Sequence, residues 1–344
     1  MRSSRRGQGS VTIQDVARAA GVSAMTVSRV VNGNSNVREA TRTTVTQAIA
    51  ELRYRPNAAA RTLAAGEATQ IGLLHANPSA AYLSQLLIGA LAGARDAGCH
   101  LVVEPCEGED AAEQARATGA FVGAEVQGVI LPPPLSESQA VRDTLATAGI
   151  AWVAIGPGRA SDDGMTVRID DFAAARAMTR HLIDLGHRDI AFVRGNPNQG
   201  ASHERHRGFI AAITAAGLDA DAMRVEPGDF TFRSGIAAAE RLLRVDRRPT
   251  AIFASNDDMA AAAVGVAHRL GLSVPGDVSI VGFDDTALAT NVWPELTTIR
   301  QPITTMAQTA ATMLIAHLQR RGGDEEQVLP FELVIRDSCA PPRR

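Results

Sequence analysis

The sequence contains no lysine: all 34 of its basic residues are arginine. This absence excludes every mechanism that needs a lysine nucleophile, a lysine base or a P-loop lysine. The three cysteines, Cys99, Cys106 and Cys339, are odd in number and far apart, which gives neither a disulfide framework nor the spacing of metal ligands. We therefore expect reduced thiols, and neither a metal site nor a cofactor.

Long apolar runs are also missing. No stretch reaches the roughly 18 apolar residues that a membrane span needs, and the polar, basic residues 1–10 are not followed by the apolar segment of a secretory signal. With 344 residues, of which 45% are hydrophobic, the chain can still bury a sizeable core in two or three domains. We expect a cytoplasmic protein with no membrane partner.

Charge is divided unevenly along the chain. Residues 1–69 contain ten arginines against the four carboxylates of Asp15, Glu39, Glu51 and Glu67, a net charge of +6. Because the whole chain carries −3, residues 70–344 carry −9. A small basic module joined to an acidic body suggests nucleic acid or an anionic membrane as the partner of the module.

The basic module begins with two short amphipathic segments separated by Gly21. Thr12 is placed to cap a first helix, and Gly21 ends it because glycine tolerates a left-handed backbone. Ser23 is placed to cap a second helix. The apolar positions at helical spacing are Ile13, Val16, Ala17 and Ala20, then Val27, Val30 and Val31. This pattern predicts a helix-turn-helix whose second helix enters the DNA major groove.

The second helix has an exposed face that can read DNA. That face is formed by Ala24, Met25, Ser28 and Arg29. Arg29 can bind guanine O6 and N7 or a phosphate, whereas alanine and methionine can contact a thymine methyl group. Ser23, Thr26 and Ser28 favour cap or phosphate roles, which position the protein without specifying a sequence.

Two further helices are predicted after this pair. The third covers about 38–52, with apolar residues spaced to pack on the first two. Pro56 can start a short helix over 57–65 that Gly66 ends. Nine residues are too few for a stable isolated helix, so we expect this segment to be ordered only when it packs against something. Its one large apolar side chain is Leu63.

The segment from Val11 to Leu63 resembles the lactose-repressor (LacI/GalR) family of bacterial transcription factors. The resemblance is carried by Asp15-Val-Ala, Gly21-Val-Ser, Thr26-Val-Ser-Arg-Val, Asn32, Tyr54-Arg-Pro-Asn and Ala60-Arg-Thr-Leu63. It implies that 57–65 is a hinge helix, paired with its dimer mate in the minor groove, where Leu63 wedges between base steps. The DNA-contacting residues that we infer are Thr12, Ser23, Ala24, Met25, Thr26, Ser28, Arg29, Asn32, Tyr54, Asn57, Ala60, Arg61 and Leu63. Ala24 and Met25 depart from the lactose repressor itself, so its operator sequence does not carry over.

Residues 70–344 alternate short apolar runs with Ala-rich amphipathic segments. The predicted strands are 71–74, 101–103, 128–131, 152–155, 166–169, 190–193, 223–225, 251–254 and 279–283, and the predicted helices include 83–97, 172–185 and 257–270. The alternation predicts a doubly wound α/β body that is long enough for two lobes. In such folds ligands bind at the carboxyl ends of the strands.

Side chains that follow these strands form a candidate effector site. They are His75, Asn77, Tyr82, Asp170, Arg205, Phe230, Asn256, Asp257 and Asp284. Carboxylate and guanidinium groups bind vicinal hydroxyl groups in pairs, and an aromatic face packs against the C–H side of a ring, so the set fits a sugar. Asp257 can equally be the N-cap of the helix that begins there.

The resemblance to the LacI/GalR family extends through about Arg336. It is carried by residues 185–190, Arg205-x-x-Gly-Phe209, Ser255-Asn-Asp257 and 275–285. It implies a periplasmic-binding-protein-like core of two lobes with the effector in the cleft. By position, Arg205, Asn256 and Asp284 are similar to residues that bind effector hydroxyls. Phe230 falls where an aromatic stacks, and Tyr82 falls where the first lobe closes the pocket.

The function implied is a transcriptional repressor whose operator affinity is set by a small sugar. We favour induction, in which the sugar weakens binding to the operator. Corepression, in which the ligand strengthens that binding, would use the same cleft and hinge helices. The tail 340–344 lacks the apolar heptads of a tetramerising coiled coil, so we expect a homodimer on a pseudo-palindromic operator. The alternatives are a corepressor-dependent regulator that binds a non-sugar metabolite, a plain sugar-binding protein, and an enzyme with adjacent aspartates as acid and base. The missing signal peptide disfavours a transport receptor, and the missing nucleophile disfavours an enzyme.

The expected division has an all-α headpiece at 1–56, a hinge helix and linker at 57–69, and an α/β core at 70–344. Within the core, lobe 1 is expected at about 70–167 and 301–326. Lobe 2 is expected at about 168–300 and 327–344.

Overall fold

The computed structural model describes residues 11–31, 37–52, 54, 69–108, 110–159, 164–322 and 324–343. The chain divides into two compact units, Met1–Ala68 and Thr69–Arg344. In the described residues of both units, every helix is too short or too polar to cross a membrane.

In the first unit three helices pack around one small core. They are α1 (Ile13–Ala20), α2 (Ala24–Val31) and α3 (Glu39–Glu51). The buried core side chains are Val16, Ala17, Val27, Val45 and Ala48. The predicted helix-turn-helix and the third helix are confirmed, and the ends of α3 differ from the predicted range 38–52 by one residue each.

Local side chains determine where α1 and α2 begin. Thr12 Oγ1 accepts a hydrogen bond from the backbone N–H of Asp15, and the Asp15 carboxylate accepts one from the backbone N–H of Thr12. This reciprocal pair is a capping box. Gly21 ends α1 with a φ of 65°, and Ser23 Oγ accepts from the backbone N–H of Thr26 at the start of α2. All three predicted helix-end roles are confirmed.

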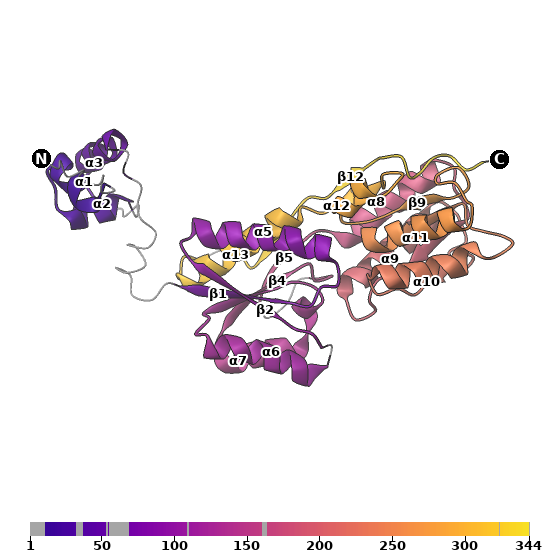
Figure 1. The fold of residues 1–344 in the computed structure, drawn as a ribbon, viewed down its shortest axis with the longest axis horizontal. Helices are drawn as coiled ribbons and strands as arrows, with labels where there is room; N and C mark the ends of the chain where they lie inside the picture. Colours follow the sequence, from indigo (N-terminus) through magenta and orange to yellow (C-terminus); the bar gives the residue numbers. More distant parts are fainter. Residues whose placement is uncertain are drawn as a thin grey trace, which may run out of the picture. The chain divides into compact units, whose positions relative to one another are not determined.

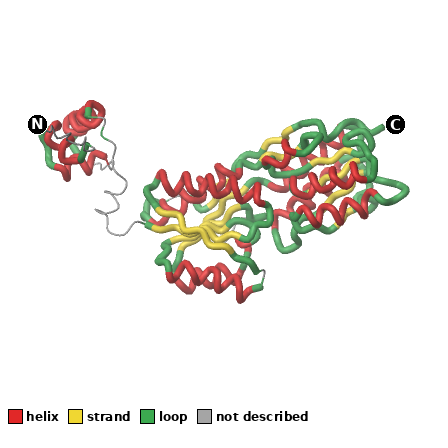
Figure 2. The backbone as a smooth tube through the Cα atoms, viewed as in Figure 1, coloured by secondary structure: helices red, strands yellow, loops and turns green. Residues whose placement is uncertain are grey.

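The second unit contains two parallel sheets, each between helices (Figures 1 and 2). The first sheet has the spatial order β11 (Glu326–Val328), β5 (Met165–Arg168), β4 (Ala151–Ile155), β3 (Gly128–Leu131), β1 (Gln70–His75) and β2 (His100–Pro105). Figure 1 shows α5 (Ala80–Asp96) and α13 (Ile303–Leu318) on one face, and α6 (Ala111–Gly123) and α7 (Gln139–Ala148) on the other. We call this sheet with its helices, and the short helix η1 (Leu135–Glu137), lobe 1.

The second sheet has four strands. Their order is β7 (Val225–Glu226), β6 (Ile190–Val193), β8 (Ala251–Ala254) and β9 (Ser279–Val281). Helix α8 (Asp171–Asp184) packs beside α9 (Gly200–Ala215), and α10 (Phe232–Leu243) packs beside α11 (Asp257–Arg269). The short helix α12 (Ala287–Asn291) and the antiparallel pair β10 (Thr298–Arg300) and β12 (Glu332–Val334) complete lobe 2. The doubly wound α/β prediction is confirmed.

The chain passes between the lobes three times. The crossings follow β5, β10 and β11, so lobe 1 is built from two separate stretches of sequence. The lobe boundary predicted at residue 326 falls inside β11, which pairs with β5 as far as Val328.

Glycine brings the two stretches of lobe 1 together. A Cβ atom on Gly89 of α5 would lie 2.0 Å from the backbone oxygen of Thr304, and one on Gly93 would lie 2.7 Å from Ala311 Cβ. The backbones of α5 and α13 are therefore in contact.

The helix α5 begins earlier than the predicted residue 83, because Ser79 Oγ accepts a hydrogen bond from the backbone N–H of Tyr82.

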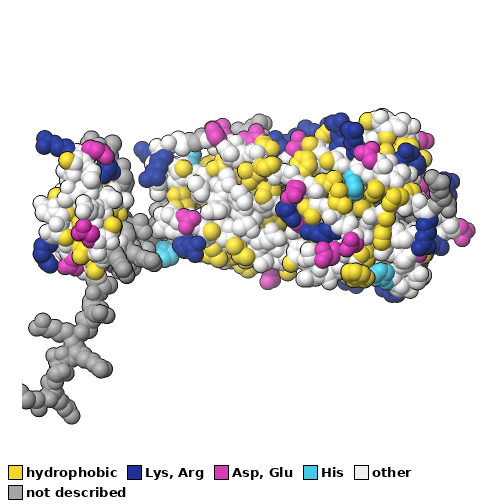
Figure 3. All heavy atoms as spheres, turned by 90° about the horizontal axis from the view of Figure 1, so that it is seen from above, with side chains coloured by type: hydrophobic (Ala, Val, Ile, Leu, Met, Phe, Trp, Pro, Cys, Tyr) yellow, Lys and Arg dark blue, Asp and Glu magenta, His cyan; other side chains and the backbone are white. Residues whose placement is uncertain are grey.

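Charged side chains on the surface of the second unit lie largely in pairs. On the face that Figure 3 shows, arginine and carboxylate groups are interspersed. Arg300 Nη1 lies 2.5 Å from Glu332 Oε2 across β10 and β12, and Arg269 Nη2 lies 2.7 Å from Glu240 Oε1 across α11 and α10. Exposed pairs of this kind contribute at most about 1 kcal/mol each. On that face the acidic charge does not form a single-sign surface.

Candidate functional site

In the first unit, α2 presents a face that combines an apolar group with a cation. Met25 is 66% exposed, and Arg29 Nη2 lies 3.7 Å from Met25 Sδ, one turn further along the helix. Val27 is completely buried on the opposite side. In the major groove an apolar side chain such as that of methionine can contact a thymine methyl group, and a guanidinium can contact a guanine edge.

The other predicted residues of this face surround that pair. The hydroxyl oxygens of Ser23 and Thr26 lie 2.9 Å apart at the start of α2, where hydroxyl and backbone N–H groups can contact phosphate. Thr12 is exposed at the start of α1, and Ser28 is half-buried. Ala24 is half-buried against the core of the first unit, so it offers less surface to DNA than the prediction assumed.

Tyr54 follows α3. Its backbone N–H donates to the backbone oxygen of Ile49 at 3.0 Å, and its side chain packs against the core of the first unit. The structure therefore shows a packing role for Tyr54. The predicted contacts Asn32, Asn57, Ala60, Arg61 and Leu63, and with them the hinge helix predicted over 57–65, lie outside the described residues.

In the second unit a polar cavity of about 40 Å³ lies between the lobes. Lobe 1 and lobe 2 both line it, together with the crossing that follows β10. The lining residues are Asn77, Ser79, Tyr82, Pro133, Gly156, Asp171, Gln199, Ala201, Arg205, Phe230, Asn256, Asp284 and Gln301. Of the nine predicted effector residues, six are brought together here. A cavity of this size holds one or a few water molecules.

Arg205 of α9 is the central cation of the cavity, and it is 5% exposed. Its Nε donates to Asp171 Oδ1 at 2.8 Å, and its Nη1 donates to the backbone oxygen of Ser255 at 2.6 Å. Its Cζ lies 3.6 Å from the centroid of the Phe283 ring, which fixes the plane of the guanidinium. Nη2 makes no hydrogen bond with the described residues, so it remains available to a hydroxyl group.

Asp284 shares this guanidinium. Its Oδ1 lies 3.7 Å from Arg205 Nη1 and accepts a hydrogen bond from Gln301 Nε2 at 2.6 Å. Burial raises the pKa of Asp284 to about 7, against the lowering effects of Arg205 and Gln301. Burial also raises the pKa of Asp171, which Arg205 counteracts. The cavity therefore combines one guanidinium with two carboxyl groups, at least one of which titrates near neutral pH.

Two cavity residues adopt backbone conformations that are unusual for side chains with a Cβ atom. The φ angles are 72° at Phe230 and 118° at Asp284. Asn256 holds the first in place, because its Nδ2 donates to the backbone oxygen of Phe230 while its Oδ1 caps α11. Such conformations cost about 1–3 kcal/mol each and gather at functional sites.

The sequence matches two known families along most of its length. Bacterial regulatory proteins of the lacI family match residues 12–57, and the periplasmic binding protein-like domain matches residues 179–339. Catabolite control protein A of Priestia megaterium is 35% identical over 330 residues, which cover 95% of this chain and 99% of the relative. The HTH-type transcriptional regulator CelR of Thermobifida fusca is 35% identical over 340 residues, covering 95% and 98%. The chain belongs to the LacI family.

Solved structures agree with this assignment. The fold of this LacI-family protein is similar to that of the transcriptional regulator CelR in complex with cellobiose, with a TM-score of 0.73, 32% identity and coverage of 95% and 99% of the two chains. It is also similar to the lac repressor dimer bound to operator and the anti-inducer ONPF, with a TM-score of 0.71, 30% identity and coverage of 96% and 100%. This LacI-family chain is a DNA-binding transcriptional regulator, and the enzyme alternative is wrong.

Three predicted effector residues of this LacI-family core do not line the cavity. His75 is the last residue of β1 and lies before the loop that reaches the cavity. Asp170 is the N-cap of α8, and its Oδ1 accepts from the backbone N–H of Ala173 at 2.9 Å.

Asp257 is the third. It is completely buried, and its carboxylate accepts hydrogen bonds from the backbone N–H of Thr286 at 2.8 Å and from Thr298 Oγ1 at 2.7 Å. It joins α11 to the N-cap of α12 and to the first residue of β10. Asn256, rather than Asp257, is the N-cap of α11.

Seven lining residues were not among the predicted site residues: Ser79, Pro133, Gly156, Asp171, Gln199, Ala201 and Gln301. Asp171 had a usable signal, since it follows the predicted strand 166–169 within one turn, as the strand-end rule requires. Gln301 had none, since it follows β10, which was not predicted and pairs antiparallel with β12. Gln199 and Ala201 reach the cavity because α9 begins beside it, which no local pattern predicts.

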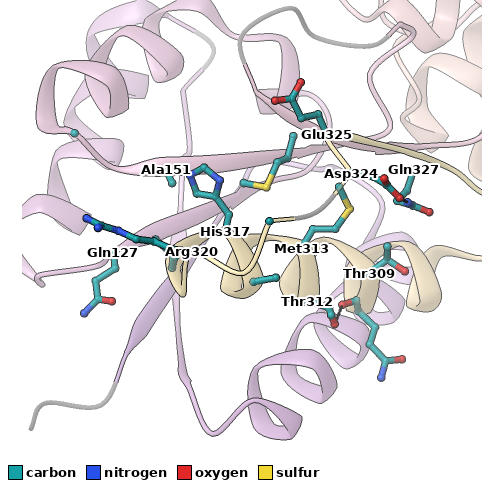
Figure 4. A pocket seen from close by; sticks show the side chains of 16 residues that line it. Gln127, Ala151, Thr309, Thr312, Met313, His317, Arg320, Asp324, Glu325 and Gln327 are labelled. Carbon is teal, nitrogen blue, oxygen red and sulfur yellow. Dashed lines mark hydrogen bonds between the residues drawn. The ribbon is translucent and has the colours of Figure 1, made fainter. Parts of the chain in front are cut away.

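A larger hollow of about 1000 Å³ lies in lobe 1 (Figure 4). It is formed by the last turns of α13, including Met313 and His317, and by the segment that leads into β11, including Asp324. Its lining comes from one lobe and from the amino ends of strands, including Ala151. Ligands in doubly wound folds bind at the opposite, carboxyl ends. The smaller interlobe cavity is therefore the better effector site.

Proposed function

We propose that this protein is a transcriptional repressor whose operator affinity is controlled by a small sugar bound between the lobes, with the sugar acting as inducer. The observation that carries the proposal is the buried Arg205, held by Asp171 and the Phe283 ring with Nη2 available. A fixed guanidinium beside carboxyl groups suits vicinal hydroxyls, which both donate and accept hydrogen bonds. The structural similarity to a CelR–cellobiose complex supports a sugar as the ligand class.

Phe230 supports the same ligand class. Its ring lies 5.6 Å from the Arg205 guanidinium, at the wall of the cavity. An aromatic face next to a hydrogen-bonding group matches a sugar ring, which has an apolar C–H face and a polar rim. Asn77 and Tyr82 face the same space from lobe 1, where they would complete the contacts to a ligand.

In such a repressor, residues 1–56 would form the headpiece, 57–69 the hinge helix and linker, and 70–344 the core. Two copies would form a homodimer that binds a pseudo-palindromic operator in the cytoplasm, on the nucleoid. Similarity to the lac repressor dimer bound to operator supports this assembly. Leu63 would wedge between base steps in the minor groove.

Coupling between the two sites follows from the size of the cavity. Ligand pockets usually enclose about 300–1,000 Å³, whereas this one encloses about 40 Å³. The lobes must therefore change their relative position before a sugar fits. Such a movement would alter the spacing of the two hinge helices in a dimer and release them from DNA.

The test is a thermal-unfolding screen of full-length protein against monosaccharides, disaccharides and nucleobases, repeated with an operator selected from random DNA. A ligand at about one hundred times its Kd should stabilise the protein by about 2.7 kcal/mol. We expect a sugar to do so, to lower operator affinity, and to lose both effects in Arg205→Ala. Arg207→Ala is the matched control, because Arg207 is half-exposed and pairs with Glu204.

Two outcomes would contradict the proposal. Stabilisation by a nucleobase and by no sugar would assign the cavity to another ligand class. Tighter operator binding in the presence of the sugar would make the ligand a corepressor.

A further inference from the structure

One helix of lobe 2 is capped by a side chain from lobe 1. α9 begins at Gly200, and the side chain of its N-cap residue, Gln199, forms no cap hydrogen bond. Glu137 of η1 fills this role, since its Oε2 accepts a hydrogen bond from the backbone N–H of Gly200 at 2.7 Å. The first N–H groups of a helix lack partners within the helix, and its N-terminus favours negative charge. The carboxylate of Glu137 therefore stabilises α9 only while the lobes touch.

The backbones at this contact are too close for side chains. A Cβ atom on Gly158, in lobe 1, would lie 2.2 Å from the carbonyl carbon of Gly200. A Cβ atom on Gly200 would lie 2.5 Å from Glu137 Oε1. The two lobes thus meet through glycine on both sides, and the Glu137 carboxylate lies beside this contact.

A second hydrogen bond joins the lobes at another helix start. Ser79, the N-cap of α5 in lobe 1, donates from its Oγ to Asp258 Oδ2 at 2.7 Å. Asp258 lies in the first turn of α11 in lobe 2. Both of these hydrogen bonds end at a lobe 2 helix that begins beside the cavity. Arg159 of lobe 1 makes a further interlobe contact, because its Nε donates to Glu204 Oε1 of α9 at 3.2 Å.

α9 also carries cavity residues. Gln199 and Ala201 flank the capped Gly200, and Arg205 lies one turn further along the helix. We propose that Glu137 is a positioning residue: by capping α9 from the opposite lobe it holds the cleft closed and fixes the helix that carries Arg205. Opening of the cleft breaks this cap, whatever ligand the cavity takes, so Glu137 sets the equilibrium between the closed and open lobes.

Amide hydrogen exchange on the full-length, ligand-free protein tests this role. Glu137→Ala should raise exchange at Gly200–Ser202 about ten- to a hundredfold, because a hydrogen bond to a charged group contributes about 1.5–3 kcal/mol and 1.4 kcal/mol is a factor of ten. Glu137→Gln, which keeps an acceptor oxygen, should restore much of the protection. Gly158→Ala should reproduce the effect of Glu137→Ala from steric contact alone.

Two matched controls lie in α6, on lobe 1. Glu113→Ala removes a carboxylate that pairs with Arg116 of the same helix, and Gly123→Ala adds a Cβ atom that meets no atom within 4 Å. Both should leave exchange at the start of α9 unchanged. Unchanged exchange there in both Glu137→Ala and Gly158→Ala would overturn the proposal. So would a uniform rise throughout lobe 1 that Glu137→Gln does not reduce, since that pattern indicates a general structural role.

Discussion

The two units of this protein place their functional side chains in opposite environments. In the first unit Met25 and Arg29 project from a helix whose other side packs on a core of five buried residues. In the second unit Arg205 and Asp284 are almost completely buried, and each is hydrogen-bonded by a neighbouring side chain, Arg205 by Asp171 and Asp284 by Gln301. Exposed groups interact with a charged partner through solvent, whereas buried groups depend on a complete set of neighbours. The same change should therefore act differently on the two sites.

Added salt should distinguish the two sites most strongly, because it should weaken DNA binding much more than sugar binding. The first unit has a net charge of +6 per chain, and proteins with roughly 6–10 phosphate contacts lose on the order of 10³–10⁵ in DNA affinity between about 50 and 200 mM salt. The affinity for a neutral sugar should change less than about twofold, because buried charges are screened little. Operator titrations and calorimetry across this range measure both. A weak salt dependence of operator binding would remove phosphate contact as its main source.

Arg205→Ala should be the most damaging single substitution of the core. It leaves the buried carboxylate of Asp171 without its guanidinium, which costs about 3–5 kcal/mol in the free energy of unfolding. In Arg207→Ala, the half-exposed control, the loss should stay below about 1 kcal/mol. Urea unfolding of the full-length protein measures both losses. Equal losses would mean that burial does not distinguish these two ion pairs.

Arg29→Ala should leave stability nearly unchanged and weaken operator binding. A bidentate contact to guanine contributes about 1–3 kcal/mol, and its loss should relax preference at one base pair. Arg18→Ala is the matched control, because Arg18 is exposed on α1 and pairs with Asp15. Binding to a library of single-base operator variants distinguishes the two cases. A loss that is uniform over all variants would identify a phosphate contact instead.

The last predicted effect is a change in the pH dependence of stability. The folded pKa of Asp284, about 7, lies above the ordinary value of 3.8, so the folded state binds more protons than the unfolded state between these values. The free energy of unfolding therefore falls as pH rises through this window. Asp284→Asn removes that contribution, and its unfolding free energy should fall less between about pH 5 and pH 8. Parallel curves for the two proteins would place the titration on another group.

Local pattern was sufficient for the features whose physical cause is local. Gly21 and Thr12 act through their own turn, so the helix-turn-helix was predicted with its caps. The rule that ligands bind at the carboxyl ends of parallel strands correctly predicted that Arg205, Asn256 and Asp284 lie at one cavity, because these strand ends share one edge of the sheet.

The residue roles that were predicted wrongly or missed have a different origin. The sequence around Asp257 does not show that Thr286 and Thr298 fold back to bind its carboxylate. Likewise, nothing near Glu137 in sequence indicates a helix start 63 residues later. Roles that depend on a partner from another segment require the tertiary structure.

The order in which lobe 1 is completed has a consequence for synthesis of the protein. α5 lies near the beginning of the core and α13 near its end, yet the two pack at backbone distance through Gly89 and Gly93. While the chain emerges from the ribosome, α5 exposes its apolar face until α13 is translated. Lobe 2 up to β10 lies between them in sequence and can fold first. A nascent chain of this protein therefore leaves the apolar face of α5 uncovered until its last few dozen residues appear.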